Sequence, residues 1–272
     1  MLFADHLIVL RGGGDLATGI AYRLHKAGFP LLVLELARPL VVRRYVALAT
    51  AVLEGEITVE GLRGQRVDTV GEALALAPTG AIPVLVAPTL PDWSAAGMRP
   101  TAIIDARMAK RNIDTRLDQA SLVVALGPGF TAGVDCHAVI ETMRGHRLGR
   151  VIWQGAAQPN TGTPGLVAGK GAERVLRAPV AGVVRWQAAI GDSVESGAVL
   201  GHVAGQPLVA PFAGVVRGLI AEGTAVSANL KIGDLDGRND RNACFTISDK
   251  ALAIGGGVLE AVLTYLNVVR GA

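Results

Sequence analysis

A glycine-rich segment near the N-terminus contains the residue types that bind a phosphate most readily. It reads Arg11-Gly-Gly-Gly-Asp15, and Gly12, Gly14 and Ala17 fit the pattern G-x-G-x-x-A. Such glycines allow a tight turn and let a pyrophosphate approach the backbone. Glu35 follows about twenty residues later, where an acid would accept hydrogen bonds from a ribose. The predicted cofactor-binding residues are Gly12, Gly13, Gly14, Asp15 and Glu35; the alternative is a tight turn beside a solvated Glu35.

The same pattern recurs in the segment Gly127-Pro-Gly-Phe-Thr-Ala-Gly133. A helix is expected to follow it at residues 134–143. In a parallel sheet both loops would lie at the carboxyl ends of their strands and form a cleft, where helix N-termini offer amide groups to an anion. We therefore add Gly127, Gly129, Phe130 and Thr131 to the predicted cofactor site. Four arginines are candidate phosphate partners, with ordinary surface positions as the alternative: Arg11, Arg43, Arg44 and Arg107.

The sequence assigns no catalytic residue and no metal ligand. Cys136 and His137 would lie in the first turn of the helix expected at 134–143, where the helix dipole favours a thiolate. A small buried thiol beside a surface imidazole is the preferred interpretation. Cys244 lies 108 positions from Cys136, so we predict neither a disulfide nor a structural zinc site. A sulfur or selenium relay through either thiol is a further hypothesis. Because no Ser-His-Asp order, HExxH motif or carboxylate pair can be assigned, enzymatic activity stays open.

The elements that would position these residues alternate in the βα manner. Apolar runs at 7–10, 31–34, 82–87, 102–105 and 121–126 are typical of buried parallel strands. Helices are expected at 16–27, ending at Gly28, and at 69–76, opened by the capping box Thr69-x-x-Glu72. Residues 54–68 alternate with period two and predict an inserted hairpin. This order predicts an α/β, Rossmann-like domain with a mostly parallel sheet over residues 1–155.

The C-terminal part contains an internal duplication. Residues 178–205 and 210–237 are identical at 12 of 28 positions, beginning with Ala178-Pro-Val-Ala-Gly and Ala210-Pro-Phe-Ala-Gly. Neither half could bury its apolar face alone, so the two should close into one small barrel at 172–238. The pattern resembles the biotinyl/lipoyl barrel-sandwich family. That family carries its prosthetic group on a lysine at the hairpin between the halves, and the hairpin here, residues 202–207, has no lysine. We therefore expect no biotin or lipoate.

Two further segments complete the predicted organisation. Residues 154–171 read as a loop or lid, with Pro159-Asn-Thr-Gly-Thr-Pro-Gly165 near its centre. Residues 239–272 are expected to contain a helix, at 251–268, that packs back on the first domain. Gly255-Gly-Gly257 inside that helix implies either close backbone packing or a break, since glycine disfavours helix by about 1 kcal/mol per residue.

Composition excludes several classes of protein. The 272 residues are 50% hydrophobic and 18% charged, which excludes a disordered chain. The net charge of +3 is dispersed and aromatic residues make up 4%, which disfavours a nucleic-acid partner. Two uncharged stretches, 73–91 and 196–216, are interrupted by proline and glycine, so neither should span a membrane. With no basic region before the first apolar run, we expect a cytoplasmic protein.

Five motifs in order resemble one family over nearly the full length: Val9-Leu-Arg-Gly-Gly-Gly-Asp-Leu-Ala-Thr-Gly19, Gly127-Pro-Gly-Phe-Thr-Ala-Gly133, Met143-Arg-Gly-His-Arg-Leu-Gly-Arg-Val151, Pro159-Asn-Thr-Gly-Thr-Pro-Gly165 and Ile247-Ser-Asp-Lys-Ala-Leu-Ala-Ile-Gly-Gly-Gly257. The resemblance is to the selenium-dependent molybdenum hydroxylase accessory family, related to xanthine dehydrogenase maturation proteins with a Rossmann-like domain. It implies a maturation factor that handles the molybdopterin cofactor or its terminal sulfur or selenium ligand, with a molybdenum hydroxylase as its client. No catalytic residue is carried over.

The leading expectation is therefore an accessory protein that binds a molybdopterin-type cofactor, or NAD(P), through the two glycine loops. One alternative is an NAD(P)-dependent oxidoreductase of unknown substrate, which would transfer hydride without a client. The other is a non-catalytic scaffold whose barrel binds a partner and whose glycine loops bind no ligand.

Overall fold

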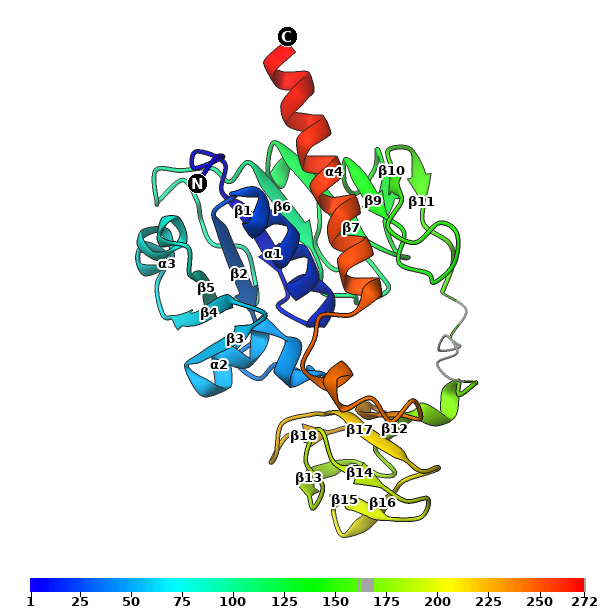
Figure 1. Cartoon of the computed structure of the whole chain (residues 1–272). Coiled ribbons are helices and arrows are strands. Elements are labelled where there is room, and N and C mark those ends of the chain that lie inside the picture. The colour runs from blue at the N-terminus through cyan, green and yellow to red at the C-terminus, as the bar shows by residue number, and fades with distance from the viewer. Residues whose placement is uncertain (161, 163–168, 272) are drawn as a thin grey trace. The chain divides into compact units, whose positions relative to one another are not determined.

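The computed structural model describes residues 1–160, 162 and 169–271, and the chain divides into two compact units (Figure 1). The first unit comprises Met1–Pro39, Ala47–Asn160 and Ile247–Ala272. The second comprises Leu40–Val46 and Thr161–Thr246. The expected C-terminal segment 239–272 is thus shared between the units, with its helix in the first. Within the expected loop or lid at 154–171, residues 161 and 163–168 lie outside the described residues.

The first unit is built on a nine-stranded, largely parallel sheet. In spatial order its strands are β10 (Val151–Ile152), β9 (Ala138–Ile140), β7 (Leu122–Leu126), β6 (Ala102–Asp105), β1 (Ile8–Arg11), β2 (Leu31–Glu35), β5 (Ile82–Val86), β4 (Leu62–Val67) and β3 (Glu56–Val59). From β9 to β4 every neighbouring pair is parallel, whereas β10 and β3 run antiparallel at the two edges. Short strands β8 (Thr131–Ala132) and β11 (Gly155–Ala156) form a separate pair. The α/β class is confirmed.

The helices of this unit follow the local sequence signals. They are α1 (Asp15–Ala27), α2 (Ala51–Glu54), α3 (Val70–Leu76) and α4 (Asp249–Gly271). Gly28 ends α1 with φ +95°, a conformation that glycine adopts without strain. Thr69 caps α3 by accepting a hydrogen bond from the Glu72 amide, at 3.1 Å, as the capping box predicts. Short 3-10 turns occur in the first unit at Leu48–Thr50, Ala77–Thr79 and Leu117–Gln119, and in the second unit at Arg44–Val46, Ala172–Arg174 and Arg241–Cys244.

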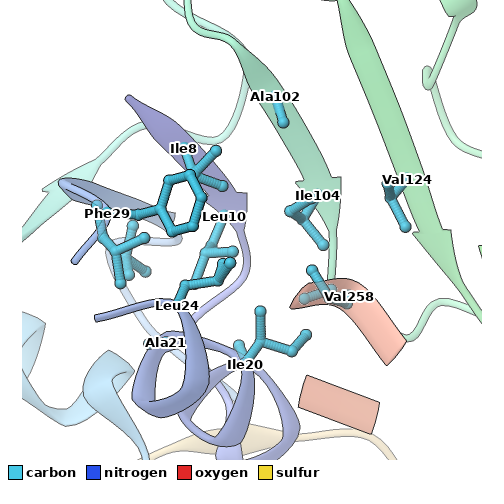
Figure 2. Packing of buried hydrophobic residues seen from close by; sticks show 14 of the residues in the cluster. Ile8, Leu10, Ile20, Ala21, Leu24, Phe29, Ala102, Ile104, Val124 and Val258 are labelled. Carbon is cyan, nitrogen blue, oxygen red and sulfur yellow. The ribbon is translucent and has the colours of Figure 1, made fainter. Parts of the chain in front are cut away.

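Helices α1 and α4 pack side by side on one face of the sheet (Figure 1). Ile20 and Leu24 of α1 and Val258 of α4 lie against Leu10 and Ile104 of the strands beneath them (Figure 2). All five side chains are fully buried. The opposite face has its own core, because alternate residues of each strand point to opposite sides; Val9 and Ile103 belong to it. Burial of both faces explains why the strands appear as continuous apolar runs.

Three consecutive glycines lie inside α4 without breaking it. A Cβ on Gly255 would lie 2.5 Å from the carbonyl oxygen of Gly19 in α1, and one on Gly257 would lie 2.0 Å from that of Gly149. Gly256, between them, faces open space. Of the two expectations for this segment, close backbone packing is confirmed.

Length and composition alone would allow α4 to cross a membrane. Its segment Asp249–Val269 contains an 18-residue window with a mean hydropathy of 1.7, and 39% of that window is buried. The core helix of a globular unit gives the same signal, and Ala251, Ile254 and Val258 of α4 are all fully buried in the core shared with α1.

The prediction of a helix at 134–143 is wrong. Val134 and Asp135 form a tight turn in which both amides donate to the carbonyl oxygen of Thr131, and β9 then runs parallel to β7. Val134, expected on a helix face, is 69% exposed. Residues 138–140 are an apolar run of strand length. Their burial in the sheet favours a strand more strongly than the weak helical spacing favours a helix.

The hairpin expected within 54–68 is confirmed, with Glu60 and Gly61 as its two-residue turn at φ +46° and +83°. It is not a separate insertion, because β4 pairs in parallel with β5 and so extends the main sheet.

The second unit is all-β and reflects the sequence repeat. One sheet has the order β12 (Val175–Arg177), β19 (Lys231–Asp236), β17 (Gly214–Leu219) and β14 (Ser193–Val194). The other has the order β16 (Gln206–Val209), β15 (Val199–Val203), β13 (Gly182–Trp186) and β18 (Ala225–Val226). Moving 32 positions along the chain converts β13, β14 and β15 into β17, β18 and β19. The two sheets are therefore equivalent, each contains strands of both repeats, and one core spans them.

Candidate functional site

The order in which the chain adds strands to the sheet reverses at β1. From β1 the chain passes through α1 to β2 on one side, whereas β6 pairs with β1 on the other side. In open parallel sheets, ligands bind at the carboxyl ends of the strands that flank such a reversal. Arg11 ends β1, Glu35 ends β2 and Asp105 ends β6, so these three residues lie at the same edge.

The first glycine loop connects β1 to α1 at this edge. Gly12 has φ +94°, and its amide donates to the carbonyl oxygen of Leu34 at 2.8 Å. A Cβ on Gly13 would lie 2.9 Å from the amide nitrogen of Ala49, which donates to the Gly13 carbonyl. Gly14 is the N-cap of α1, and no side chain caps the helix there. The N-terminus of α1 therefore keeps its positive dipole end, with Asp15 as its first residue.

Glu35 is brought to this loop, as expected. Its Oε2 accepts a hydrogen bond from the Gly13 amide at 2.8 Å, and its Oε1 accepts one from the Leu36 amide at 2.7 Å. The side chain is half-buried. The acid and the glycine turn thus lie in direct contact, although they are 22 positions apart in the sequence.

The second glycine loop follows β7 at the same edge but is filled by the protein itself. A Cβ on Gly127 would lie 2.4 Å from Thr142 Oγ1, and one on Gly129 would lie 2.5 Å from the amide nitrogen of Arg111. Phe130 is buried in the core, and the Thr131 amide donates to Asp135 Oδ2 at 2.7 Å. Because no helix follows this loop, it offers no helix N-terminus to an anion. That part of the expectation is wrong.

The segment after β6 lies against both glycine loops. A Cβ on Gly12 would lie 3.2 Å from the Arg107 backbone, and a Cβ on Gly129 would lie against the backbone of Arg111. Within the segment, Met108 and Lys110 have positive φ angles of +56° and +60°, which non-glycine residues rarely adopt. Backbone of the protein's own chain therefore packs where we expected a cleft between the loops.

A network of charged side chains covers the carboxyl ends of β1 and β6. Asp114 accepts from Arg11 at 2.7 Å and from Arg107 at 2.7 Å. Arg107 also pairs with Asp105 at 2.6 Å, and the Thr115 hydroxyl donates to Asp105 at 2.6 Å. Arg11, Asp105 and Thr115 are buried. Sequence analysis missed Asp105, Asp114 and Thr115; the available signal was the acid that ends the apolar run at 102–105.

Electrostatics keep Asp114 ionised. Its burial raises the pKa, but hydrogen bonds and charge from Arg11 and Arg107 outweigh this effect and hold the pKa of Asp114 below its ordinary value. The Asp114 carboxylate is thereby a fixed negative charge between two guanidinium groups. Arg11 and Arg107 are thus already paired with carboxylates.

The other two candidate arginines belong to the second unit. Arg43 donates to the carbonyl oxygens of Ala243 and Thr246, at 2.8 Å and 3.2 Å. Arg44 Nε donates to the carbonyl oxygen of Leu219 at 2.8 Å. Both arginines thus hydrogen-bond to backbone carbonyls of their own unit.

Neither cysteine is placed as a reactive thiol. Cys136 is fully buried beside β8, and burial, followed by the charge of Asp135, raises its pKa to about 12. The adjacent His137 accepts the Val123 amide at Nδ1, at 2.9 Å, and burial lowers its pKa. Cys244 is buried in the second unit, and burial raises its pKa. The preferred interpretation of Cys136 as a small buried residue is confirmed. Among the described residues, no group of three or more His, Cys, Asp or Glu is placed to hold a metal ion.

Comparison with known proteins gives one strong sequence match. The chain is 48% identical over 261 residues to the uncharacterized protein YqeB of Escherichia coli strain K12, a match that covers 96% of this chain and 48% of that protein. The chain therefore spans about half the length of the curated relative it matches. No family model matches the chain.

Among solved structures, the crystal structure of an aspartoacylase family protein from Mesorhizobium loti aligns at 14% identity. The alignment covers 85% of this chain and 84% of that one, with a TM-score of 0.28. A likeness at this level bears on neither the detailed fold nor the function.

Proposed function

We propose that the protein binds a phosphate-bearing cofactor, a molybdopterin-type molecule or NAD(P), at the first glycine loop. The observation that supports this most directly is the 2.8 Å hydrogen bond between the Gly13 amide and the Glu35 carboxylate. It joins the two features that a dinucleotide site requires, a glycine turn at an uncapped helix N-terminus and an acid at the end of the next strand. The predicted site at Gly127, Gly129, Phe130 and Thr131 is not part of this proposal, because those residues pack against the protein itself.

The ligand would lie along the first turn of α1. Its phosphate would accept hydrogen bonds from backbone amides there, where the helix dipole stabilises negative charge. Glu35, which now accepts the Gly13 amide, would also accept ribose hydroxyl groups. The Arg11–Asp114–Arg107 network would fix the neighbouring strand ends, since both arginines are already paired.

We further propose a Rossmann-like fold for the first unit and a biotinyl/lipoyl-like barrel for the second. The reversal of strand order beside β1 supports the former, and the two equivalent four-stranded sheets support the latter. The turn between β15 and β16 holds Ala204 and Gly205 in place of a lysine, so this barrel would contact a partner rather than carry biotin or lipoate.

On this basis we propose a cytoplasmic accessory protein that takes part in maturation of a molybdenum hydroxylase. The motif resemblance extends this proposal to selenium-dependent hydroxylases. Support comes from the five ordered motifs and from a site suited to a phosphate-bearing cofactor. The client enzyme would be the protein partner.

The first test combines mass spectrometry of small molecules released from the purified protein with titrations of NAD⁺, NADP⁺ and molybdopterin. The variant Gly14→Val tests the site, because Gly14 has φ −65° and ψ −179°, which valine adopts readily. We expect at least tenfold weaker binding in Gly14→Val and unchanged binding in Gly256→Ala, whose added methyl faces open space.

Three outcomes distinguish the alternatives. Retained pterin supports the maturation role. Nicotinamide nucleotide alone, with hydride transfer in the absence of a client, would replace the proposal by an oxidoreductase. Binding that is equal in the Gly14→Val variant and the parent protein would show that the first glycine loop is not the site.

A further inference from the structure

A cavity that is open to solvent lies in the first unit, distinct from the glycine loops, and has basic side chains in its lining. It has a volume of about 650 Å³, within the usual range for small-molecule sites. Its lining includes three basic residues, His146, Arg147 and Arg150, together with Glu141 and Gln158. These residues come from two segments, 141–150 and 156–159, which overlap two of the five motifs noted in the sequence and have no part in the proposed cofactor site.

The basic segment is held in one conformation by its backbone. The Glu141 amide donates to the Arg150 carbonyl at 3.0 Å, and the Gly149 amide donates back to the Glu141 carbonyl at 2.9 Å. Gly149 has φ +81° and packs directly on α4, where a Cβ would lie 2.5 Å from the carbonyl oxygen of Ala253. The loop is thus a closed turn packed on α4, which fixes the backbone positions from which its basic side chains project.

Glu141 joins the two walls of the cavity. Its carboxylate is buried, and each oxygen accepts a backbone amide, from Met143 and from Gln158, both at 2.8 Å. These hydrogen bonds connect the two segments that line the cavity. The amide donors also compensate the negative charge of the carboxylate locally.

The basic side chains of the segment fall into two groups. Arg144 forms an ion pair with Asp249 of α4, at 2.8 Å and 3.0 Å. Arg147 and Arg150 form no ion pair with a carboxylate in the part of the chain that the structure describes, and both line the cavity. Two guanidinium groups that line one cavity and form no ion pair with the described carboxylates attract an anion, and their planar donors match phosphate oxygens in pairs.

We propose that this cavity binds the phosphate group of a phosphorylated small molecule, with Arg147 and Arg150 as the phosphate ligands. His146 supplies a further ring nitrogen, and Gln158 supplies a polar group for the remainder of the molecule. The inference rests on the residues of this cavity alone and stands whether or not the first glycine loop binds a cofactor.

The test measures binding of inorganic pyrophosphate, AMP and adenosine to the full chain by isothermal titration calorimetry. The double variant Arg147→Gln/Arg150→Gln removes both charges at exposed positions, and Arg144→Gln removes a charge from the same turn without touching the cavity lining. We expect pyrophosphate and AMP to bind at least tenfold more weakly to the double variant and within twofold of the parent protein to Arg144→Gln. Adenosine, which has no phosphate, should bind at least tenfold more weakly than AMP.

The Gly14→Val variant separates this site from the proposed cofactor site. Binding of pyrophosphate that survives in Gly14→Val and is lost in the double variant supports the inference. Binding that is the same in the double variant and the parent, adenosine binding as tight as that of AMP, or no saturable binding at all would overturn it. Equal thermal unfolding of the double variant and Arg144→Gln would show that a loss of binding is not a loss of fold.

Discussion

Glu35, at the end of β2, accepts a hydrogen bond from the backbone amide of Gly13, in the turn between β1 and α1, at 2.8 Å. The parallel pairing of β1 with β2, in which Arg11 lies beside Leu34, places the acid next to the turn. The negative charge of Glu35 therefore lies beside the uncapped N-terminus of α1, where the dipole stabilises it. If the proposed cofactor is a nucleotide, this charge bears on which nucleotide the site would accept.

If the cofactor is a nicotinamide nucleotide, NAD⁺ should bind at least tenfold more tightly than NADP⁺. The 2′-phosphate of NADP⁺ would lie close to the Glu35 carboxylate, and like charges repel. The variant Glu35→Gln should narrow this preference, because it removes the charge while keeping an oxygen that can accept the Gly13 amide. Titration of both nucleotides into both proteins measures the effect. A preference that is unchanged in Glu35→Gln would place the nucleotide elsewhere.

The part of the site that follows from sequence is the part encoded locally. The strand at Ile8–Arg11, the glycine turn, α1 and Glu35 lie within 28 residues, and each has a strong local signal in apolar periodicity or turn chemistry. The helix predicted at 134–143 failed because Ala138–Ile140 is a short apolar run, which periodicity alone cannot assign to strand or helix.

The remaining features arise from contacts between distant parts of the chain. Arg11 meets Asp114 across 103 positions, and no local pattern marks Asp114 as the partner of a buried arginine. The basic cavity likewise depends on Gly149 packing on α4 and on Glu141 joining two loops. A single sequence shows the residue types of such a cluster, but only the tertiary fold brings them together.

Replacing Asp114 by asparagine should destabilise the protein at neutral pH. The carboxylate accepts from Arg11, which is buried, and from Arg107, so its loss leaves a buried guanidinium poorly compensated. We expect a loss of about 1–2 kcal/mol after allowance for solvent screening, since the Asp114 side chain is 37% exposed. Urea unfolding of Asp114→Asn and of the exposed-site control Asp118→Asn at pH 7 measures it.

The effect of Asp114→Asn should depend on pH in a defined direction. Because the folded state lowers the pKa of Asp114, the carboxylate contributes stability that is fully present above the ordinary aspartate pKa, about 3.9, and is lost as pH falls through the lower folded-state pKa. The stability difference between the parent protein and Asp114→Asn should therefore be largest near neutral pH and shrink toward pH 3. A difference that grows on acidification would contradict this assignment.

Neither cysteine should react while the protein is folded. With a pKa of about 12, roughly one Cys136 thiol in ten thousand is ionised at pH 8, and the side chain is fully buried. Cys244 is also buried, and its thiol lies 3.7 Å from the carbonyl oxygen of Val216. Mass spectrometry after treatment with iodoacetamide should show no alkylation in buffer and two alkylated thiols in urea. Alkylation of native Cys136 at the rate of free glutathione would revive the hypothesis of a sulfur relay.

The three glycines of α4 allow the close packing of that helix to be measured with an internal control. Alanine at each position improves helix propensity by about 1 kcal/mol, so this gain cancels in a comparison among the variants. The methyl group of Gly257→Ala would overlap the carbonyl oxygen of Gly149, at 2.0 Å, whereas that of Gly256→Ala meets nothing within 4 Å. We expect Gly257→Ala to be less stable than Gly256→Ala by about 1–3 kcal/mol, the usual cost of overpacking.

Urea unfolding followed by helical circular dichroism measures the difference in the relevant unit, because α1, α2, α3 and α4 all lie in the first unit. Equal midpoints for the two variants would mean that α4 does not approach the Gly149 turn as closely as the structure shows, and the wall of the basic cavity would then lose its support.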